Sequence, residues 1–361
     1  MSQIRSSISN ISINTMPKQH KQTAHSISTT NIPWIPIATV NPMRTKAEIL
    51  RWNRGSWEEW DNFCHSSTGL DSANLHTPAG GMTIFIHDTK VDRWVSGSIK
   101  KSGAWEYEIL TLIHHYMARD PDMHLLDIGS HVGQYSLMGA RMGRQVIAVD
   151  PLYENVIRLC SSIQHNKFSS KIKVFYTALS DIQSTVSFIQ EHGNVGGTKI
   201  MRKKSSSNIT LESSTATIMK DNTGLSHIKV VQTPSEFDKN TIQTVLLDDL
   251  LPFVTFKKAF MKIDVESHEN SVLKGGEEFF KSVEIPCIFM EWFQHAKKQD
   301  TAAEILDFMK RHKYTPRQPK LEGKIPAADL PEYSSYFSVK LQEILEKFRQ
   351  QIYQNILPIF C

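Results

Sequence analysis

The apolar residues in the middle of this chain alternate between helical and strand patterns. Helical spacing from Trp105 to Tyr116 predicts a helix that leads into the apolar strand HLLDIG, which ends at Gly129. A helix after Gly133, the strand QVIAVD, a helix through Ile163 and the strand KIKVFYTAL follow in order. Near-continuous apolar strands separated by helices are typical of a parallel sheet that is covered on both faces. We therefore predict an α/β fold with a doubly wound, mostly parallel sheet.

The pattern weakens between residues 182 and 243, which we interpret as an insertion beside the sheet. Within it, TVSFIQ and HIKVVQ predict strands, and KIMRKKSSSN predicts a basic, serine-rich loop. The segment TVLLDDLLPF, the strand AFMKIDVE, a helix through Leu273, the strand EIPCIFME and a helix from Ala302 to Met309 follow. The predicted organisation is a disordered tail at 1–47, a lead-in segment at 48–104, a main domain at 105–315 and a C-terminal extension with a helix at 316–361.

Composition and charge restrict the classes of partner. The chain has 361 residues, is 40% hydrophobic and carries a formal net charge of +4, without a long basic block interleaved with aromatic residues. Nucleic acid is therefore not indicated as a partner. No apolar run approaches the roughly 20 residues that span a bilayer, so we expect a soluble protein of the cytoplasm or of the secretory-pathway lumen.

The four cysteines are far apart and include no C-x-x-C pair, which argues against a zinc ribbon or a dense disulfide framework. Cys160 falls on the apolar face of a predicted helix and Cys287 in a predicted strand, so we expect both to be buried thiols. A bridge between Cys64 and Cys361 stays open at this stage.

The segment DIGSHVGQ at 127–134 joins the first strand to the following helix, and the next strand ends in Asp150. Gly129 and Gly133 leave room for a ligand to approach the backbone, and a carboxylate at the end of the second strand can accept the hydroxyls of a ribose. The spacing D-x-G-x-x-x-G lacks the G-x-G-x-x-G of pyrophosphate-binding dehydrogenases. A nucleoside cofactor without a pyrophosphate fits better, and S-adenosyl-L-methionine is the obvious candidate.

Downstream, the segment KIDVESHE at 262–269 is introduced by LLDDLL. Together with the glycine turn, TALSD at 177–181 and NVGG at 194–197, it resembles the FkbM-type methyltransferases. The resemblance implies a class I, Rossmann-like, seven-stranded sheet that binds S-adenosyl-L-methionine, and an O-methyltransferase whose acceptor is a hydroxyl on a sugar of a glycan or glycoconjugate. The match departs at Ser267 and His268, where the family usually has glycine and a small residue.

The resemblance also implies roles for residues around the cofactor. Asp127 and the loop 129–131 would face its methionine end, Glu106 would hold its ammonium, and Asp150 would bind the ribose. The adenine would lie between Pro151, Ala178 and Asp181. The candidate cofactor residues are Glu106, Asp127, Gly129, Ser130, His131, Gly133, Asp150, Pro151, Ala178 and Asp181.

Carboxylates and a histidine gather where the strand AFMKIDVE ends, and open α/β sheets place their chemistry at such an edge. The acceptor hydroxyl must lose its proton during methyl transfer, so Asp264, Glu266 and His268 are candidate catalytic residues. Alternatively, Asp264 and Glu291 hold a divalent cation, Mn²⁺ or Mg²⁺, that acidifies the hydroxyl. A purely structural alternative pairs Lys262 with Glu266 and makes Glu269 a helix cap. Trp292 and Phe293 are candidate substrate residues that stack on a sugar ring.

Two other functions stay open on the sequence alone. The domain could be a cofactor-binding module without catalytic activity, or a methyltransferase that acts on a small molecule other than a carbohydrate. An oxidoreductase that binds a dinucleotide is disfavoured by the glycine spacing.

Overall fold

The computed structural model describes residues 46–53, 55–60, 63–66, 69–202, 217–220, 226–229, 239–291, 299–317 and 359–360, all within one compact unit, Thr39–Cys361. The predicted tail up to residue 45 and the predicted C-terminal helix at 339–352 lie outside the described residues.

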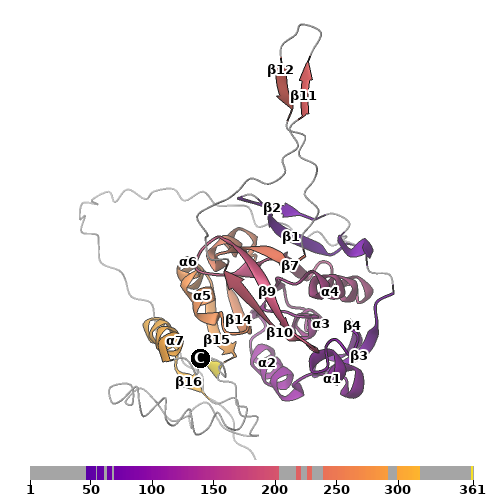
Figure 1. Ribbon diagram of the computed structural model, residues 1–361. Coiled ribbons are helices and arrows are strands. Elements are labelled where there is room, and N and C mark those ends of the chain that lie inside the picture. Colours follow the sequence, from indigo (N-terminus) through magenta and orange to yellow (C-terminus); the bar gives the residue numbers. More distant parts are fainter. Residues whose placement is uncertain are drawn as a thin grey trace, which may run out of the picture. The chain divides into compact units, whose positions relative to one another are not determined.

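The fold is built on a large, mostly parallel sheet (Figure 1). Its nine described strands are, in spatial order, β16 (Pro316–Arg317), β17 (Ile359–Phe360), β15 (Glu284–Met290), β14 (Lys258–Ile263), β5 (His124–Ile128), β6 (Val146–Asp150), β7 (Ile172–Tyr176), β1 (Glu48–Asn53) and β2 (Ser56–Glu59). The six strands from β15 to β1 run parallel to one another, whereas β2 and β17 pair antiparallel with their neighbours. The α/β class and the mostly parallel sheet are confirmed.

The number of strands differs from the seven that the resemblance implied, because the lead-in segment contributes two of its own. β1 joins the edge of the sheet beside β7, with Ile49 opposite Val174, and β2 turns back on β1. The first two strands of the predicted lead-in segment are therefore part of the main sheet.

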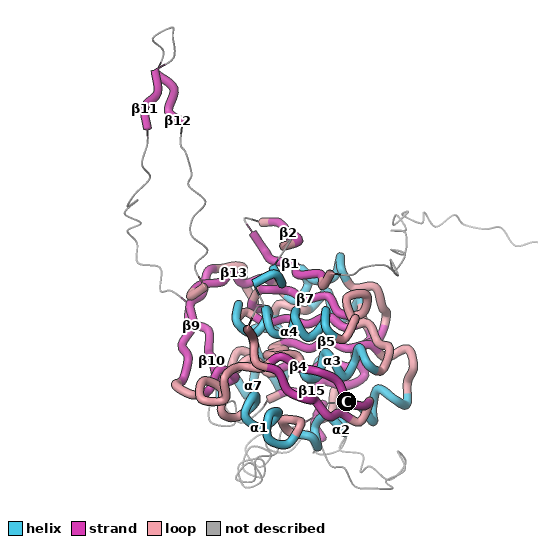
Figure 2. Tube along the Cα trace, turned by 90° about the vertical axis from the view of Figure 1, so that its right-hand side faces the viewer, coloured by secondary structure: helices cyan, strands magenta, loops and turns pink. Residues whose placement is uncertain are grey.

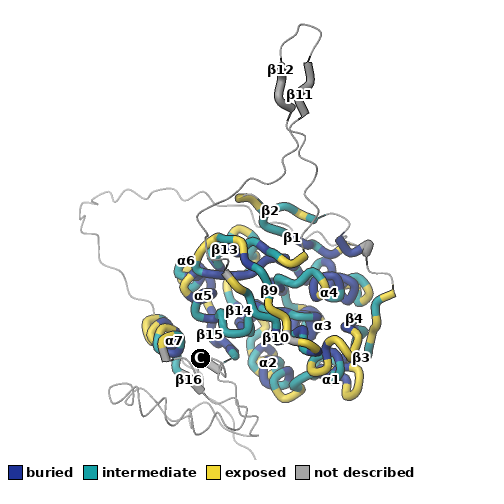
Figure 3. The backbone as a smooth tube through the Cα atoms, viewed as in Figure 1, coloured by how far each residue is buried: buried dark blue, intermediate teal, exposed yellow. Residues whose placement is uncertain are grey.

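Helices cover both faces of the sheet. One apolar core contains residues of α2 (Tyr107–Arg119), α3 (Gln134–Arg141) and α4 (Tyr153–His165), and the other contains residues of α5 (Glu269–Lys274), α6 (Glu277–Ser282) and α7 (Gln299–Arg311) (Figures 1 and 3). Neighbouring strand residues point to opposite cores, as Leu125 and Leu126 do. Each fully buried leucine contributes about 1.5–3 kcal/mol, so the apolar residues on both sides of the strands stabilise both layers.

The insertion forms a small second sheet. β9 (Thr185–Glu191) and β10 (Asn194–Arg202) make an antiparallel hairpin, which Figure 2 shows beside the main sheet. β9 also pairs with β13 (Thr241–Val245), and β13 in turn pairs with β8 (Ala178–Leu179). Along the chain, β13 is followed by the short helix η2 (Leu247–Phe253). The start of the predicted basic loop is thus strand up to Arg202, and 203–208 lie outside the described residues. The other strand pair of this region is β11 (Thr217–Lys220) with β12 (Ser226–Lys229).

The lead-in segment also packs against α4. It contains η1 (Phe63–Ser66), the hairpin of β3 (Ser72–Thr77) and β4 (Gly80–Phe85), and α1 (Val95–Ser102). Phe85 N donates to Ser162 Oγ at 2.9 Å, and Thr83 N donates to Asn166 Oδ1 at 3.2 Å. These hydrogen bonds hold the hairpin on the helix that follows Asp150.

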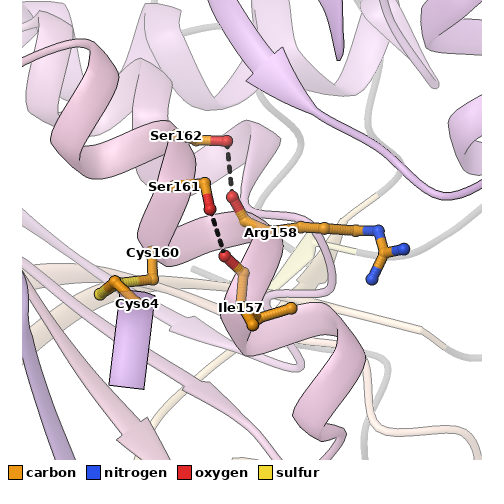
Figure 4. The surroundings of a disulfide bond; sticks show 6 residues. All are labelled: Cys64, Ile157, Arg158, Cys160, Ser161 and Ser162. Atoms are coloured by element: carbon orange, nitrogen blue, oxygen red, sulfur yellow. Dashed lines mark hydrogen bonds between the residues drawn. A yellow bond between two sulfur atoms is a disulfide. The ribbon is translucent and has the colours of Figure 1, made fainter. Parts of the chain in front are cut away.

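A disulfide bond links Cys64 in η1 to Cys160 in α4, with the two Cα atoms 5.8 Å apart (Figure 4). The expectation of a free thiol at Cys160 is therefore wrong, as is a bridge from Cys64 to Cys361. Cys287, expected to be a free thiol, is disulfide-bonded as well. The apolar faces of η1 and α4 meet, and that contact brings Cys64 and Cys160 within bonding distance. In the described part of the chain, no helix has the length and apolar character needed to cross a membrane.

Replacing both Cys64 and Cys160 by alanine should lower the free energy of unfolding by about 2–4 kcal/mol, because the bond closes a long loop of the unfolded chain. The sequence separation of the two cysteines is 96 residues. Urea denaturation of the oxidised proteins measures the difference. A double variant as stable as the wild type would show that the cross-link adds nothing.

Candidate functional site

A cavity of about 400 Å³ opens at the carboxyl ends of β5, β6 and β14. Its walls come from the loop after β5, from residues 150–152 after β6, from the end of β14 and from β10. Of the candidate cofactor residues, those that line the cavity are Glu106, Gly129, Ser130, His131, Gly133, Asp150, Pro151 and Ala178. Asp127 and Asp181 are not among the lining residues.

The two glycines of the turn have a different physical role from the one expected. Gly129 and Gly133 have φ angles of +79° and +90°, which disfavour other residues. A Cβ at Gly129 would collide with the carbonyl oxygen of Asp264, and one at Gly133 would collide with the side chain of Leu159. The glycines therefore allow β14 and α4 to approach the loop closely, and they shape the cavity from behind.

Polar atoms of the same loop are buried without a partner. Ser130 Oγ and both ring nitrogens of His131 are buried and have no hydrogen-bond partner within the part of the chain that the structure describes. Burial lowers the pKa of His131 to about 3, although Asp92, whose Oδ2 lies 3.7 Å from His131 Nε2, opposes that shift. Buried polar groups without partners are uncommon, and these belong to residues of the loop that lines the cavity.

Asp150 is a buried carboxylate with three hydrogen-bond donors. His131 N donates to Oδ2 at 2.7 Å, and Leu152 N and Asn155 Nδ2 donate to Oδ1 at 2.9 and 3.0 Å. Burial raises the pKa of Asp150 to about 7, against the opposing effect of these hydrogen bonds. Since each carboxylate oxygen has two lone pairs, Asp150 can still accept a hydroxyl.

Lys262 lies at the centre of the charges behind the cavity. Its Nζ donates to Gly129 O at 2.6 Å and lies 3.7 Å from Asp127 Oδ1 and 3.5 Å from Asp264 Oδ2. Burial lowers the pKa of Lys262, but the carboxylates of Asp264 and Asp127 outweigh it and raise the pKa above its usual value. The pairing of Lys262 with Glu266, which the sequence left open as a structural alternative, is not among the ion pairs of the described residues, because β14 ends at Ile263 and the chain turns before Glu266.

Three carboxylates meet where β14 and β15 end. One oxygen each of Asp264, Glu266 and Glu291 lies within 4.8 Å of the others, and all three residues line the cavity. Burial and the nearby Asp264 and Glu266 raise the pKa of Glu291 to about 9. A divalent cation would relieve this repulsion, and carboxylate oxygens are ligands that Mg²⁺ and Mn²⁺ accept.

The turn after β14 is strained at the position where the sequence departs from the family. Glu266 and Ser267 have φ angles of +55° and +78°, in the left-handed region where glycine is favoured. Val265 N donates to Glu269 Oε1 at 3.0 Å, so Glu269 holds this turn from the first residue of α5. His268 also lines the cavity, and its Nε2 lies 2.9 Å from Ser180 Oγ.

Glu106 also lines the cavity. It precedes α2 in a left-handed conformation, with φ +47°. Gln134 fixes the preceding residue, since it accepts from Trp105 N at 3.2 Å and donates to Trp105 O at 3.1 Å. Burial and Asp264 raise the pKa of Glu106 to about 7, and Lys262 opposes the shift. An ammonium group in the cavity would find a carboxylate here.

The sequence model of the Methyltransferase FkbM domain matches residues 127–316. The chain belongs to the FkbM methyltransferase family. A solved structure of the methyltransferase FkbM from Methylobacillus flagellatus KT is similar to 55% of this chain and 41% of its own, with 16% identity and a TM-score of 0.33. The chain thus spans about two fifths of the length of that protein. None of the curated proteins matches the present chain.

Several residues of the cavity were missed from the sequence. Trp94, Val95 and Trp105 line it although they precede the FkbM match, and residues 194–198 of β10 cover it. The motif NVGG, part of the FkbM resemblance, was the signal that could have placed β10 there. The candidate substrate residues Trp292 and Phe293 lie outside the described residues.

Proposed function

We propose that this protein is an S-adenosyl-L-methionine-dependent O-methyltransferase that acts on a sugar hydroxyl of a glycan or glycoconjugate. The observation that carries the cofactor assignment is Asp150, which three donors hold at the end of β6, beside the unpartnered polar atoms of Ser130 and His131. One ribose hydroxyl can donate to the remaining lone pair on Oδ2 of this carboxylate. Family membership supports methyl transfer.

The residues present fit this cofactor at both ends. Pro151 and Ala178 supply apolar surface for the adenine, and Glu106 supplies a carboxylate for the ammonium. When bound, the cofactor supplies an electrophilic methyl group on a sulfonium. The buried Lys262, held by Asp127 and Asp264, keeps the loop 129–131 in place through Gly129 O.

Asp264 is our first choice for accepting the proton of the acceptor hydroxyl. Its side chain lines the cavity and is 40% exposed, so an acceptor can reach it. Glu266 is the second choice, while His268 has one ring nitrogen next to Ser180 Oγ. Alternatively, Asp264, Glu266 and Glu291 hold Mn²⁺ or Mg²⁺, and the cation acidifies the hydroxyl.

An exposed aromatic residue at the cavity supports a carbohydrate acceptor. Trp94 is 59% exposed and lines the cavity, and an indole can stack on the apolar face of a pyranose. Carboxylates on the opposite side can accept hydrogen bonds from sugar hydroxyls. Two alternatives are a small-molecule acceptor other than a carbohydrate and a cofactor-binding module without activity. Turnover assays distinguish both from the proposed function.

The disulfides bear on where the protein acts. Cys64, Cys160 and Cys287 are all disulfide-bonded. Disulfides persist in oxidising environments and are rare in the cytosol. Of the two compartments that the sequence left open, we therefore favour the secretory-pathway lumen.

Asp150→Asn should weaken binding of S-adenosylhomocysteine and remove the part of its pH dependence that Asp150 contributes, leaving the part that Glu106, whose pKa is also about 7, contributes. The ribose binds the ionised carboxylate, so wild-type affinity should be full above pH 7 and fall up to about tenfold per unit below the pKa of about 7. Calorimetric titration between pH 5.5 and 8.5 measures both effects. Asp181→Asn, outside the cavity lining, serves as the control and should bind like the wild type. Tight, pH-independent binding by the wild type would reject the ribose assignment.

Asp264→Asn should lower turnover by about two orders of magnitude if Asp264 is a general base, with affinity for S-adenosylhomocysteine largely retained. Asp120→Asn is the matched control, because Asp120 pairs with Lys258 at the other end of β14. Activity that chelation abolishes and Mn²⁺ or Mg²⁺ restores would assign the role to a cation instead. Normal turnover of Asp264→Asn without any metal effect would exclude Asp264 from the chemistry.

Trp94→Ala should raise the KM for a glycan acceptor about tenfold through loss of stacking, with cofactor affinity unchanged. Tyr107→Ala is the matched control, since Tyr107 is also exposed but does not line the cavity. Labelled methyl transfer to a glycan panel identifies the acceptor for this assay. Transfer to small molecules without sugars, and to no glycan, would contradict a carbohydrate acceptor.

A further inference from the structure

A chain of buried polar groups lies behind Asp150. His87, in the loop between β4 and α1, is 4% exposed, and its Nε2 lies 2.7 Å from Asn155 Oδ1. Asn155, in the first turns of α4, is 2% exposed and donates from Nδ2 to Asp150 Oδ1. His87 precedes the part of the chain that the family model matches, and no motif in the sequence connects it with Asp150.

The direction of these hydrogen bonds is fixed by chemistry. An ionised carboxylate only accepts, so the amide nitrogen of Asn155 must face Asp150 and its oxygen must face His87. That oxygen also only accepts, so Nε2 of His87 carries the proton. If no donor met Asn155 Oδ1, the amide could rotate and turn its oxygen toward Asp150. His87 therefore determines whether the amide nitrogen or the amide oxygen of Asn155 faces Asp150.

The same segment also lies near His131, whose backbone binds the other oxygen of Asp150. His87 N donates to Ser96 Oγ at 3.1 Å, and Ser96 donates from N and Oγ to Asp92 Oδ2 at 2.8 and 2.6 Å. Asp92 Oδ2 lies 3.7 Å from the ring of His131, whose backbone N donates to Asp150 Oδ2. Residues 87–96 thus lie beside Asn155 and His131, which donate to the two oxygens of Asp150.

We propose that His87 is a positioning residue of the cofactor site, which orients Asp150 through Asn155 so that the carboxylate is ionised and aimed at the ribose. This inference rests on the proposed cofactor. It extends the site into the lead-in segment, beyond the residues that the family model covers. The aligned donor at Asn155 stabilises the ionised form of Asp150, and ribose binding requires that form.

Charged groups around the network set the background for a test by pH. Lys262 of β14 faces Asp150, while Arg158 and Glu154 of α4 and Asp92 of the loop face His87. The ring of His131, in the loop after β5, also lies beside His87, with the two ring centroids 5.6 Å apart. Burial and Arg158 lower the pKa of His87, so the imidazole is neutral near pH 7 and donates from Nε2. Loss of this donor should raise the pKa of Asp150, and the pH below which the ligand dissociates should rise with it.

The experiment compares His87→Leu, which has no donor, with His87→Gln, whose amide can donate to Asn155. Calorimetric titration with S-adenosylhomocysteine across pH should show about tenfold weaker binding by His87→Leu at pH 7, as for loss of one hydrogen bond in a charged network. Its affinity profile should shift to higher pH, and His87→Gln should recover both properties. His124→Leu is the matched control, since His124 also makes one hydrogen bond, from Gln145 N, at the amino end of β5.

Each outcome decides something. A His87→Leu protein that is less stable but binds with unchanged affinity and pH profile, like His124→Leu, would overturn the positioning role. Nitrogen NMR of the wild-type imidazole needs no variant: a His87 ring protonated on Nδ1 alone would also overturn it. Absence of S-adenosylhomocysteine binding by the wild type would instead reject the proposed function.

Discussion

The arrangement of the cavity depends on one buried ammonium group, that of Lys262. It is 3% exposed, and its Nζ meets the carbonyl of Gly129 and the carboxylates of Asp127 and Asp264. A buried cation without such partners would be strongly destabilising, so its contacts fix the ends of β5 and β14 relative to each other. The glycine at 129 follows from the same constraint, because the backbone of Asp264 occupies the space of a side chain there.

Backbone strain is also concentrated among the residues that line the cavity. Glu106, His131 and Glu266 line it and have φ angles of +47°, +51° and +55°. Left-handed conformations of such residues cost free energy and persist where the surrounding contacts determine them. Here the contacts are those of Gln134 with Trp105, of His131 N with Asp150, and of Val265 N with Glu269.

Local patterns were sufficient to predict the sheet, the glycine loop and the position of Asp150, because each depends on neighbouring residues and on the periodicity of strands and helices. Contacts between distant segments were not predictable. The bond of Cys64 to Cys160 and the pairing of β1 with β7 each join segments about a hundred residues apart or more. Asp181 ends the motif TALSD and accepts a hydrogen bond from Ser180 Oγ at 3.1 Å, but it is not among the residues that line the cavity, so its contact with the adenine stays a prediction.

The lead-in segment contributes to the site although it contains none of the FkbM motifs. It adds β1 to the sheet, is cross-linked to α4, places Trp94 at the cavity and brings His87 to Asn155. Two of these contacts, the disulfide bond and the hydrogen bond between His87 and Asn155, are made to α4, which follows Asp150. A fragment that began at residue 105 would keep Asp150 but would lose the groups that support it from behind. The boundary of the site therefore lies well before the boundary of the motif.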